Sequence, residues 1–386
     1  MAWTIAYDAA TLAAQRKLQT ALEEAGIAVL AVHDAPAVPP EETAAARSAD
    51  EGRGYSSRAA YLAAWAQQPH APFTATLHFA PLMPESDRLP QTADFASDIA
   101  SPNVGERQAR RECAAYLAAP ALQYATARDV PAGPPTARLS AALSFGTIAA
   151  RTVLHAIDER ARDRFLLVEE RLSLDALRRS LGERDFFLQL AWFFEGSPDA
   201  PLQARMRRFA FAREHPALAA WRDGRTGYPL VDAGMRQLRA TGWMHPRARA
   251  VAASFLCFDL AVDWRIGRDA WERELEEDDA AVATGNWQWI AGVGADLAQF
   301  PRIYNPRKQA RTYDPAGTYA RRWIPELRGL PVPGLAGAPR RSDPQLGLPL
   351  FDAEPYPEPV VNHERAARDF LRRYGEFRSS AANASR

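Results

Sequence analysis

The segment Ala281-Val-Ala-Thr-Gly-Asn-Trp-Gln-Trp-Ile290 decides how this chain folds. Its two tryptophans, Trp287 and Trp289, are two residues apart, which on an α-helix separates their side chains by about 200° around the axis. Both rings therefore cannot enter the same core. We expect one ring to be buried in a large helical core rich in tryptophan, and the other to face a surface or a cleft.

Two helices are predicted upstream of this segment. Gly227-Tyr-Pro-Leu-Val-Asp232 places a proline in a first helical turn, and the helix that follows ends at Gly242. The apolar run over residues 251–264 predicts a second, long buried helix. Asp259 and Asp263 interrupt this run, so it is too short to span a membrane.

The composition limits the classes of function. The chain has 386 residues, enough for a sizeable core, and its formal net charge is zero, so any nucleic-acid site must be a local basic patch. Cys113 and Cys257 are far apart, which excludes a disulfide framework and a cysteine-ligated iron–sulfur cluster. The seven histidines show no metal-ligand spacing. Since no targeting or membrane segment is visible, we expect a cytoplasmic monomer without a metal.

Five ordered blocks resemble a known family, the flavin domain of DNA photolyases and cryptochromes, over about residues 124–330. The resemblance implies a mainly α protein, in which a truncated α/β remnant (1–35) and a linker (36–103) precede a helical FAD-binding domain (104–386). The blocks are Gly224-Arg-Thr-Gly-Tyr-Pro-Leu-Val-Asp-Ala233, Gly242-Trp-Met-His-Pro-Arg247, Asp263-Trp-Arg265, Asn286-Trp-Gln-Trp289 and Arg302-Ile-Tyr-Asn-Pro306.

Local patterns predict the elements before residue 119. Residues 3–7 and 27–32 are predicted strands, and the helix between them, 10–24, stops at Gly26. Two further helices are predicted at 57–67 and 105–118. Two strands make a poor sheet by themselves. The family's sheet holds an antenna pigment, and because most of its strands are missing we expect no antenna here. Either the gene is short, which Met1 favours, or the true start lies upstream.

The resemblance implies non-covalent FAD. No Gly-x-Gly-x-x-Gly motif follows a strand, so a Rossmann crossover is not supported. Ser140 and Thr147 occupy predicted helix N-caps, which suit a pyrophosphate but are also explained by capping alone. Arg249 and Glu277 match the pair over the isoalloxazine, although without the family they are an ordinary ion pair. The cofactor positions carried over are Tyr124, Thr136, Ala137, Leu139, Ser140, Arg184, Arg249, Glu277, Asp278, Asp279 and Ala283.

The DNA-contacting positions are only partly kept. Five positions carry residues that differ from those of the repairing members; they are Ser180, Glu183, Pro246, Ala250 and Ala283. A carboxylate at Glu183 would also repel phosphates. We therefore expect weak or absent repair of cyclobutane dimers, through drift in an unused site or through a new ligand. The retained positions imply that a polyanion or planar ligand still binds in the cleft; they are Arg128, Arg247, Trp289 and Arg302.

An electron relay is also only partly kept. The family passes electrons to photoexcited FAD through three tryptophans, of which the inner two match Trp287 and Trp264, while the outer one is Phe211. Phenylalanine is far harder to oxidise, so we expect inefficient photoreduction unless Trp221, Tyr228 or Trp271 provides another exit. Alternatively, Phe211 serves packing alone.

Three functions remain open at this level. The protein is a light-driven DNA-repair enzyme that injects an electron from reduced FAD, a cryptochrome-like photoreceptor that signals without turnover, or a flavin-binding module without a light reaction. Two sets of positions distinguish these alternatives: the positions that contact a lesion are mostly replaced, and the positions that hold the flavin are mostly retained. Nothing in the sequence identifies a protein partner.

Overall fold

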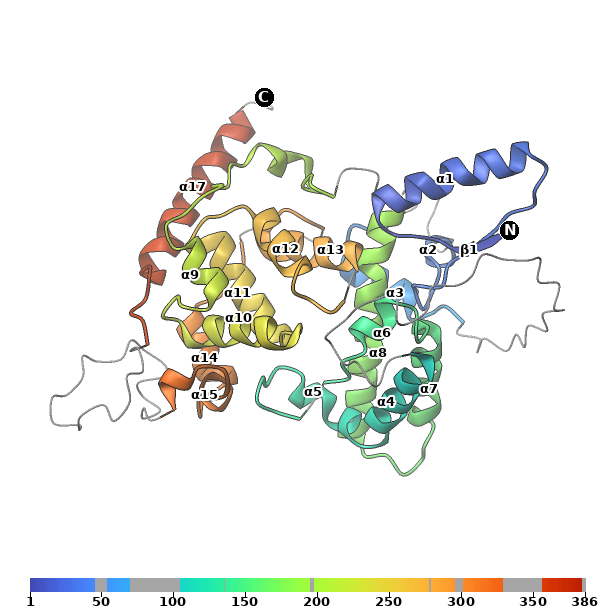
Figure 1. The fold of residues 1–386 in the computed structure, drawn as a ribbon, viewed down its shortest axis with the longest axis horizontal. Helices are drawn as coiled ribbons and strands as arrows, with labels where there is room; N and C mark the ends of the chain where they lie inside the picture. The colour runs from blue at the N-terminus through green and yellow to red at the C-terminus, as the bar shows by residue number, and fades with distance from the viewer. Residues whose placement is uncertain are drawn as a thin grey trace, which may run out of the picture.

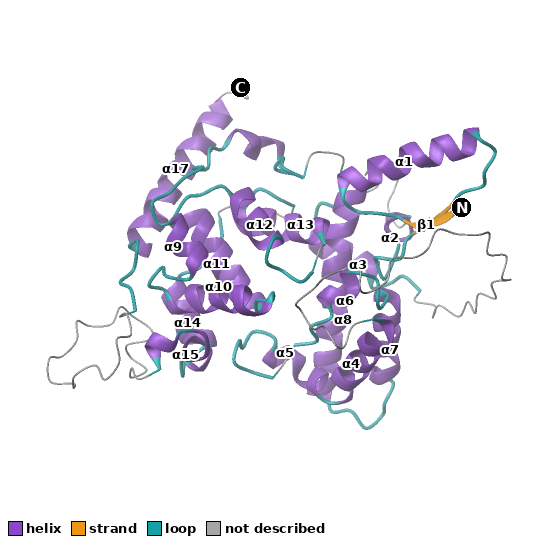
Figure 2. Cartoon of the chain, in the orientation of Figure 1, coloured by secondary structure: helices purple, strands orange, loops and turns teal. Residues whose placement is uncertain are grey.

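The computed structural model describes residues 1–45, 54–69, 105–134, 136–194, 198–277, 279–295, 301–328 and 356–383. Asp278 lies outside these ranges. Helices make up most of the described chain, with strands only near the N-terminus (Figure 2). Figure 1 shows two groups of helices, with the long helix α8 (Val168–Phe193) in one and α9 to α15 in the other. The mainly helical fold expected from the sequence is confirmed.

The N-terminal residues form a strand–helix–strand unit. β1 (Ala2–Thr4) pairs in parallel with β2 (Leu30–Val32), and α1 (Ala9–Glu24) connects them. Gly26, just after α1, has a φ of 74°, which its missing side chain allows. Both strands are shorter than predicted. No residue of α1 is buried, so this unit encloses no core of its own.

The first core packs around α8. Its buried side chains include Leu154, Leu174 and Phe186, and also Tyr61 and Trp65 from the segment predicted to be a linker. The helix predicted over 57–67 is present as α3, which begins after Ser57, whose side chain accepts from the Ala60 amide. The helices of this region are α2 (Pro40–Ala44), α3 (Arg58–Trp65), α4 (Glu106–Ala118), α5 (Tyr124–Ala127), α6 (Ser140–Ser144) and α7 (Ala150–Ala161), with a 3-10 turn at Pro120–Gln123.

The second core gathers the tryptophan-rich helices. Its members include Trp221, Trp264, Trp271 and Trp287, all buried. Its elements are α9 (Leu218–Asp223), α10 (Pro229–Thr241), α11 (Pro246–Ser254), α12 (Trp264–Glu272), α13 (Ala280–Ala291), α14 (Pro306–Tyr313), α15 (Thr318–Trp323) and α17 (His363–Asn383), with 3-10 turns at Ala204–Arg208 and Pro325–Leu327.

Helix α10 and the two tryptophans of α13 follow the sequence predictions. Pro229 is the first residue of α10, and Gly242 ends it in the left-handed conformation with a φ of 65°. Trp287 is buried in the second core, whereas Trp289 is only half-buried. The prediction that only one of the two rings is buried in the core is confirmed.

The prediction of one helix over residues 251–264 is wrong. Helix α11 ends at Ser254, a π-helical turn follows at Phe255–Asp259, and α12 starts only at Trp264. The two aspartates explain the break. Asp259 bonds to His363 Nδ1 of α17 over 2.6 Å, and Asp263 caps α12 by accepting from the Arg265 amide over 3.0 Å.

Two predicted N-caps are also wrong. Helix α6 has Leu139 at its cap, and Ser140 is its first residue. Helix α7 begins at Ala150, so Thr147 precedes its cap by two residues. Each hydroxyl has another partner: Ser140 Oγ donates to Glu277 Oε2 over 3.1 Å, and Thr147 Oγ1 donates to the Ala142 carbonyl over 3.2 Å.

Candidate functional site

Two arginine–carboxylate pairs lie where the two cores meet. Arg249 of α11 forms a short ion pair with Glu277, whose other carboxylate oxygen accepts from Ser140. Arg184 of α8 pairs with Asp279 over 2.9 Å. Helices α6, α8 and α11 and the start of α13 thus contribute to one polar cluster, named here the arginine pair site. It brings together five of the residues predicted to hold the cofactor.

Each group in the arginine pair site is fixed by a second contact. Asp279 caps α13 by accepting from the Val282 amide over 3.2 Å, and Arg184 also donates to the Ala35 carbonyl over 2.6 Å. Arg249 Nε donates to the Met244 carbonyl over 2.8 Å. The side chains are mostly shielded from solvent, with Glu277 13% and Arg184 13% exposed. Such partly buried pairs hold two guanidinium groups in fixed positions.

The loop before α6 is strained at Arg138. This residue has a φ of 48°, in the left-handed region that non-glycine residues rarely adopt. Its guanidinium lies 4.5 Å from the centre of the Trp243 ring. Backbone strain of this kind clusters at binding sites, where the surroundings impose it. This strain could not be predicted, because no local sequence pattern indicates a left-handed arginine. Beside it, Leu139 is buried, and Thr136 and Ala137 are half-buried.

A histidine beside this site has an unused donor. Burial, with the nearby charges of Arg247 and Arg249, lowers the pKa of His245 to about 4, so its imidazole is neutral near pH 7. Its Nδ1 accepts from the Arg247 amide over 3.1 Å, which assigns the proton to Nε2. Within the described residues, that buried Nε2 has no hydrogen-bond partner.

Tyr124 and Ser180 bond to each other across the first core. The tyrosine hydroxyl lies 2.8 Å from Ser180 Oγ, which also contacts the Ala176 carbonyl over 3.0 Å. Arg128 stands 5.5 Å from the centre of the Tyr124 ring. Ser180, at a position expected to touch a lesion, therefore donates its only hydroxyl proton to the Ala176 carbonyl and accepts from Tyr124.

Trp289 lies among charged side chains from distant segments, and we call this group the Trp289 cluster. The guanidinium groups of Arg58 and Arg302 lie 5.2 and 5.3 Å from its ring centre. Glu183 is 3.8 Å from Arg58 and 3.5 Å from Arg179. The sequence missed Arg58, because this residue sits on α3 in the predicted linker and no local pattern relates it to Trp289.

Most of the remaining positions expected to contact DNA or a ligand lie on α11. Pro246 is its exposed first residue and Ala250 is half-buried. Arg247 pairs with Asp129 over 2.6 Å and lies 4.2 Å from the centre of the Tyr313 ring. Ala283 is half-buried on the first turns of α13. Arg247 is thus already paired within the protein, while Arg302 is exposed.

The tryptophans that the sequence related to an electron relay are buried, and three of them have close ring contacts. Trp287 lies 4.5 Å from Trp271, ring centre to ring centre, and Trp271 lies 6.2 Å from Trp221 at an interplanar angle of 15°. Trp264 is fully buried. Phe211 contacts Phe209 over 5.0 Å, in an aromatic cluster with Phe370 of α17, so its ring packs α17 against the second core.

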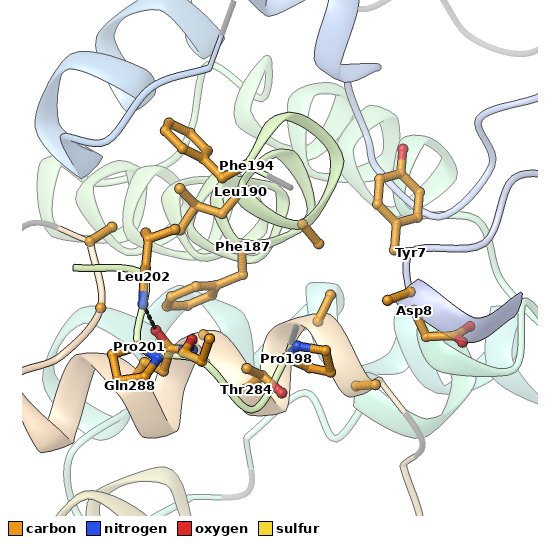
Figure 3. Close-up of a pocket in the computed structure, with 18 of the residues that line it drawn as sticks. Tyr7, Asp8, Phe187, Leu190, Phe194, Pro198, Pro201, Leu202, Thr284 and Gln288 are labelled. Atoms are coloured by element: carbon orange, nitrogen blue, oxygen red, sulfur yellow. Dashed lines mark hydrogen bonds between the residues drawn. The ribbon is translucent and has the colours of Figure 1, made fainter. Parts of the chain in front are cut away.

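A separate, largely apolar cavity lies between the start of α1, the end of α8 and α13 (Figure 3). Tyr7, Phe187 and Thr284 line it, and Gln288 accepts from the Leu202 amide at one side over 2.9 Å. None of the predicted site residues lines this cavity. Within the described ranges, no group of three or more His, Cys, Asp or Glu side chains is arranged to hold a metal, and no helix is long and apolar enough to cross a membrane.

Comparison with known proteins gives consistent matches. The family model described as the FAD binding domain of DNA photolyase matches residues 177–376. A deoxyribodipyrimidine photo-lyase of Halobacterium salinarum is 34% identical over 376 residues, which cover 95% of this chain and 76% of the relative. Cryptochrome-1 of Arabidopsis thaliana is 31% identical over 93% of this chain, and the matched part is 54% of the length of that cryptochrome. The crystal structure of a class III photolyase from Agrobacterium tumefaciens aligns with a TM-score of 0.81 and 29% identity, covering 98% of this chain and 79% of that one.

Proposed function

Because this chain belongs to the DNA photolyase and cryptochrome family, we propose that it is a blue-light-responsive flavoprotein. It holds FAD non-covalently and binds DNA or a related anionic ligand in the cleft over the flavin. Light-driven repair of cyclobutane dimers is weak or absent. A bound FAD would supply light-driven one-electron chemistry.

The arginine pair site carries this proposal. Arg249 and Arg184 are positioned by Glu277 and Asp279, so a negative charge on a flavin ring or a phosphate can be stabilised without moving either guanidinium. Ser140 and Thr136 supply hydroxyl groups beside the strained loop, and His245 Nε2 is an unused buried donor. These donors and charges fit an anionic, polar cofactor. Asp278 and Ala283 complete the positions carried over from the family.

The Trp289 cluster supports an anionic ligand in the cleft. Trp289 offers a half-buried aromatic ring, and Arg58 and Arg302 place positive charge beside it. The repulsion of phosphates expected from Glu183 is reduced, because Arg58 and Arg179 lie close to its carboxylate. An unpaired, stacked base with its phosphate matches this combination of a ring and cations.

The lesion contacts support weak repair. Ser180 is engaged with Tyr124 and the Ala176 carbonyl, and Pro246 and Ala250 have no side-chain group that can donate a hydrogen bond. Each lost contact of this kind costs roughly 1–3 kcal/mol of binding. Together, such losses would lower the affinity for a dimer by orders of magnitude.

Spectroscopy and repair assays test the proposal. We expect the purified, FAD-reconstituted protein to show flavin absorption bands and to bind single-stranded DNA, with at most about threefold preference for a dimer-containing strand. A folded, colourless protein that cannot take up FAD would overturn the flavoprotein assignment. Efficient light-dependent removal of dimers by the reduced protein would overturn the weak-repair claim.

A further part of the proposal is that FAD is the sole chromophore. The described sheet has two strands, and α1 buries no residue against it. A folate or deazaflavin absorption band that co-purifies at near one per flavin would contradict this part.

A cryptochrome-like signalling role is the second candidate. The replaced lesion positions, beside a retained arginine pair site, favour it over turnover. It predicts a light-dependent change in the hydrogen exchange of α17 that occurs without DNA, and identical exchange in light and darkness would rule it out.

A further inference from the structure

We infer that, in the flavoprotein proposed above, the electron vacancy on Trp287 moves through Trp271 to Trp221 rather than to Trp264. The inference rests on that proposed function, since photoexcited FAD is the oxidant. Trp271 of α12 and Trp221 of α9 are thereby relay residues. Trp221 takes the role of the outer relay tryptophan, whose position in this chain is Phe211.

Ring contacts define the route. Trp287 and Trp271 have ring centres 4.5 Å apart and planes at 56°, so their edges are in van der Waals contact. Trp271 and Trp221 are stacked at 15° with centres 6.2 Å apart. Trp264 makes no comparable ring contact with Trp271 or Trp287 in the part of the chain that the structure describes. Short ring-to-ring steps favour the route through Trp271.

Electrostatics disfavour a vacancy on Trp264. The guanidinium groups of Arg265 and Arg268 lie 5.0 and 5.3 Å from its ring centre. A cation over an aromatic face is attracted to the neutral ring and repels a positively charged one. Four carboxylates pair with these two cations and offset much of the repulsion, so the ring contacts carry the choice of route; they are Asp263, Asp199, Asp269 and Glu272. Among the described residues, no guanidinium lies over Trp221 or Trp271 in this way.

Hydrogen bonding gives the route a direction. The buried Nε1 of Trp271 has no partner within the described residues, and neither has that of Trp264. Trp221 Nε1 donates to the Ala252 carbonyl over 3.0 Å. A carbonyl oxygen stabilises the N–H group as the indole becomes positive, so Trp221 is the easiest of the three to oxidise.

The electron balance is simple. One electron leaves Trp287 for the flavin, one moves from Trp271 to Trp287, and one moves from Trp221 to Trp271, so that Trp221 alone is oxidised. Its proton stays on Nε1, because the Ala252 carbonyl is too weak a base to remove it. Trp221 is also fully buried. The vacancy therefore rests in the second core and returns when no external donor reaches it.

Transient absorption of the FAD-loaded full chain tests the relay. Trp271→Phe should lower the yield of tryptophan radical that survives a microsecond by about tenfold or more, and Trp221→Phe should shorten its lifetime by a similar factor. Trp264→Phe should have the smaller effect. The matched control is Trp323→Phe on α15, since Trp323 also has a buried Nε1 without a partner in the described chain and should leave the radical unchanged.

Outcomes that overturn the relay are separable from failure of the proposed function. The relay is overturned if Trp264→Phe removes the radical while Trp271→Phe preserves it. In FAD-free protein, circular dichroism should show an exciton couplet from the coupled rings of Trp287, Trp271 and Trp221. Trp271→Phe should remove this couplet and Trp221→Phe should reduce it to the Trp271–Trp287 part, and a wild type without the couplet also overturns the relay. A protein that takes up no FAD shows no flavin spectrum, and this outcome means that the proposed function has failed. The relay then fails as well, even if the couplet is present.

Discussion

One buried carboxylate, Asp185, fastens the chain before α2 to the middle of α8. Its Oδ2 accepts from the amides of Ala37 and Val38 over 2.9 and 3.0 Å and from Trp65 Nε1 over 2.9 Å. Burial raises its pKa from 3.8 to about 6, because Arg184 and the three donors only partly compensate the loss of solvent.

This raised pKa predicts a pH-dependent stability. The folded protein holds the Asp185 proton more tightly than the unfolded chain, so this group favours folding below about pH 4, and the contribution is lost as the pH rises to about 6. The shift corresponds to about 3 kcal/mol. Between about pH 4 and pH 6 the unfolding free energy should therefore decrease less in Asp185→Asn than in the wild type. Urea unfolding at a series of pH values measures it.

The control for this measurement is Asp175→Asn, which changes an exposed carboxylate on the same helix. Some slope should remain in Asp185→Asn, because burial also raises the pKa of Asp259 to about 6. A slope identical to that of the wild type would show that Asp185 titrates normally.

Arg302 gives a second prediction at this scale. It is exposed and lies over Trp289. If it contacts a phosphate, Arg302→Gln should weaken single-stranded DNA binding and reduce the slope of log K against log salt by about 0.7. Fluorescence anisotropy at several salt concentrations measures this slope. Arg213→Gln, at another exposed arginine, is the control, and an equal change in both variants would point to general electrostatics.

At the scale of elements, a glycine sets the approach of α13 to α8. A Cβ atom at Gly285 would overlap the Phe187 ring, so these helices can pack closely only while position 285 lacks a side chain. Gly375 on α17 is the opposite case, since a Cβ there would meet open space.

These two glycines form a matched pair. Gly285→Ala should lower the unfolding free energy by roughly 1–3 kcal/mol through overpacking. Gly375→Ala should raise it by about 1 kcal/mol, because alanine favours an exposed helix. Denaturant unfolding of both variants tests this pair. Equal effects would mean that α13 moves away from α8 at little cost.

At the scale of the whole molecule, the arginine pair site joins the two cores. Ser140 and Arg184 belong to elements around the first core, whereas Arg249 belongs to α11 in the second. A cofactor bound there would contact elements of both cores. Its binding should therefore stabilise them together.

Ligand binding to the folded state alone predicts the size of this effect. FAD at 100 times its dissociation constant should raise the unfolding free energy by about 2.7 kcal/mol. Glu277→Gln, which removes the partner charge of Arg249, should reduce the gain at the same FAD concentration, whereas the exposed Glu214→Gln should not. Thermal unfolding with and without FAD measures the gain. An undiminished gain in Glu277→Gln would place the cofactor elsewhere.

The sequence by itself determined the features that depend on neighbouring residues. Pro229 and Gly242 bound α10, and the two-residue spacing in α13 separates a buried tryptophan from a half-buried one. Backbone sterics, capping and helical periodicity act within a few residues, so they can be read without knowing the fold. The family resemblance supplied the site positions, and the structure brings five of them into one cluster.

Only the tertiary structure decided which distant groups meet. It placed Arg58 over Trp289 and stacked Trp271 on Trp221. It also broke the apolar run 251–264 where Asp259 bonds to His363 of α17. These contacts join segments far apart in the chain, and they follow from how helices pack and how buried polar groups find partners. No local pattern encodes such partners, because the free energy that selects them is gained only when the separate helices come together.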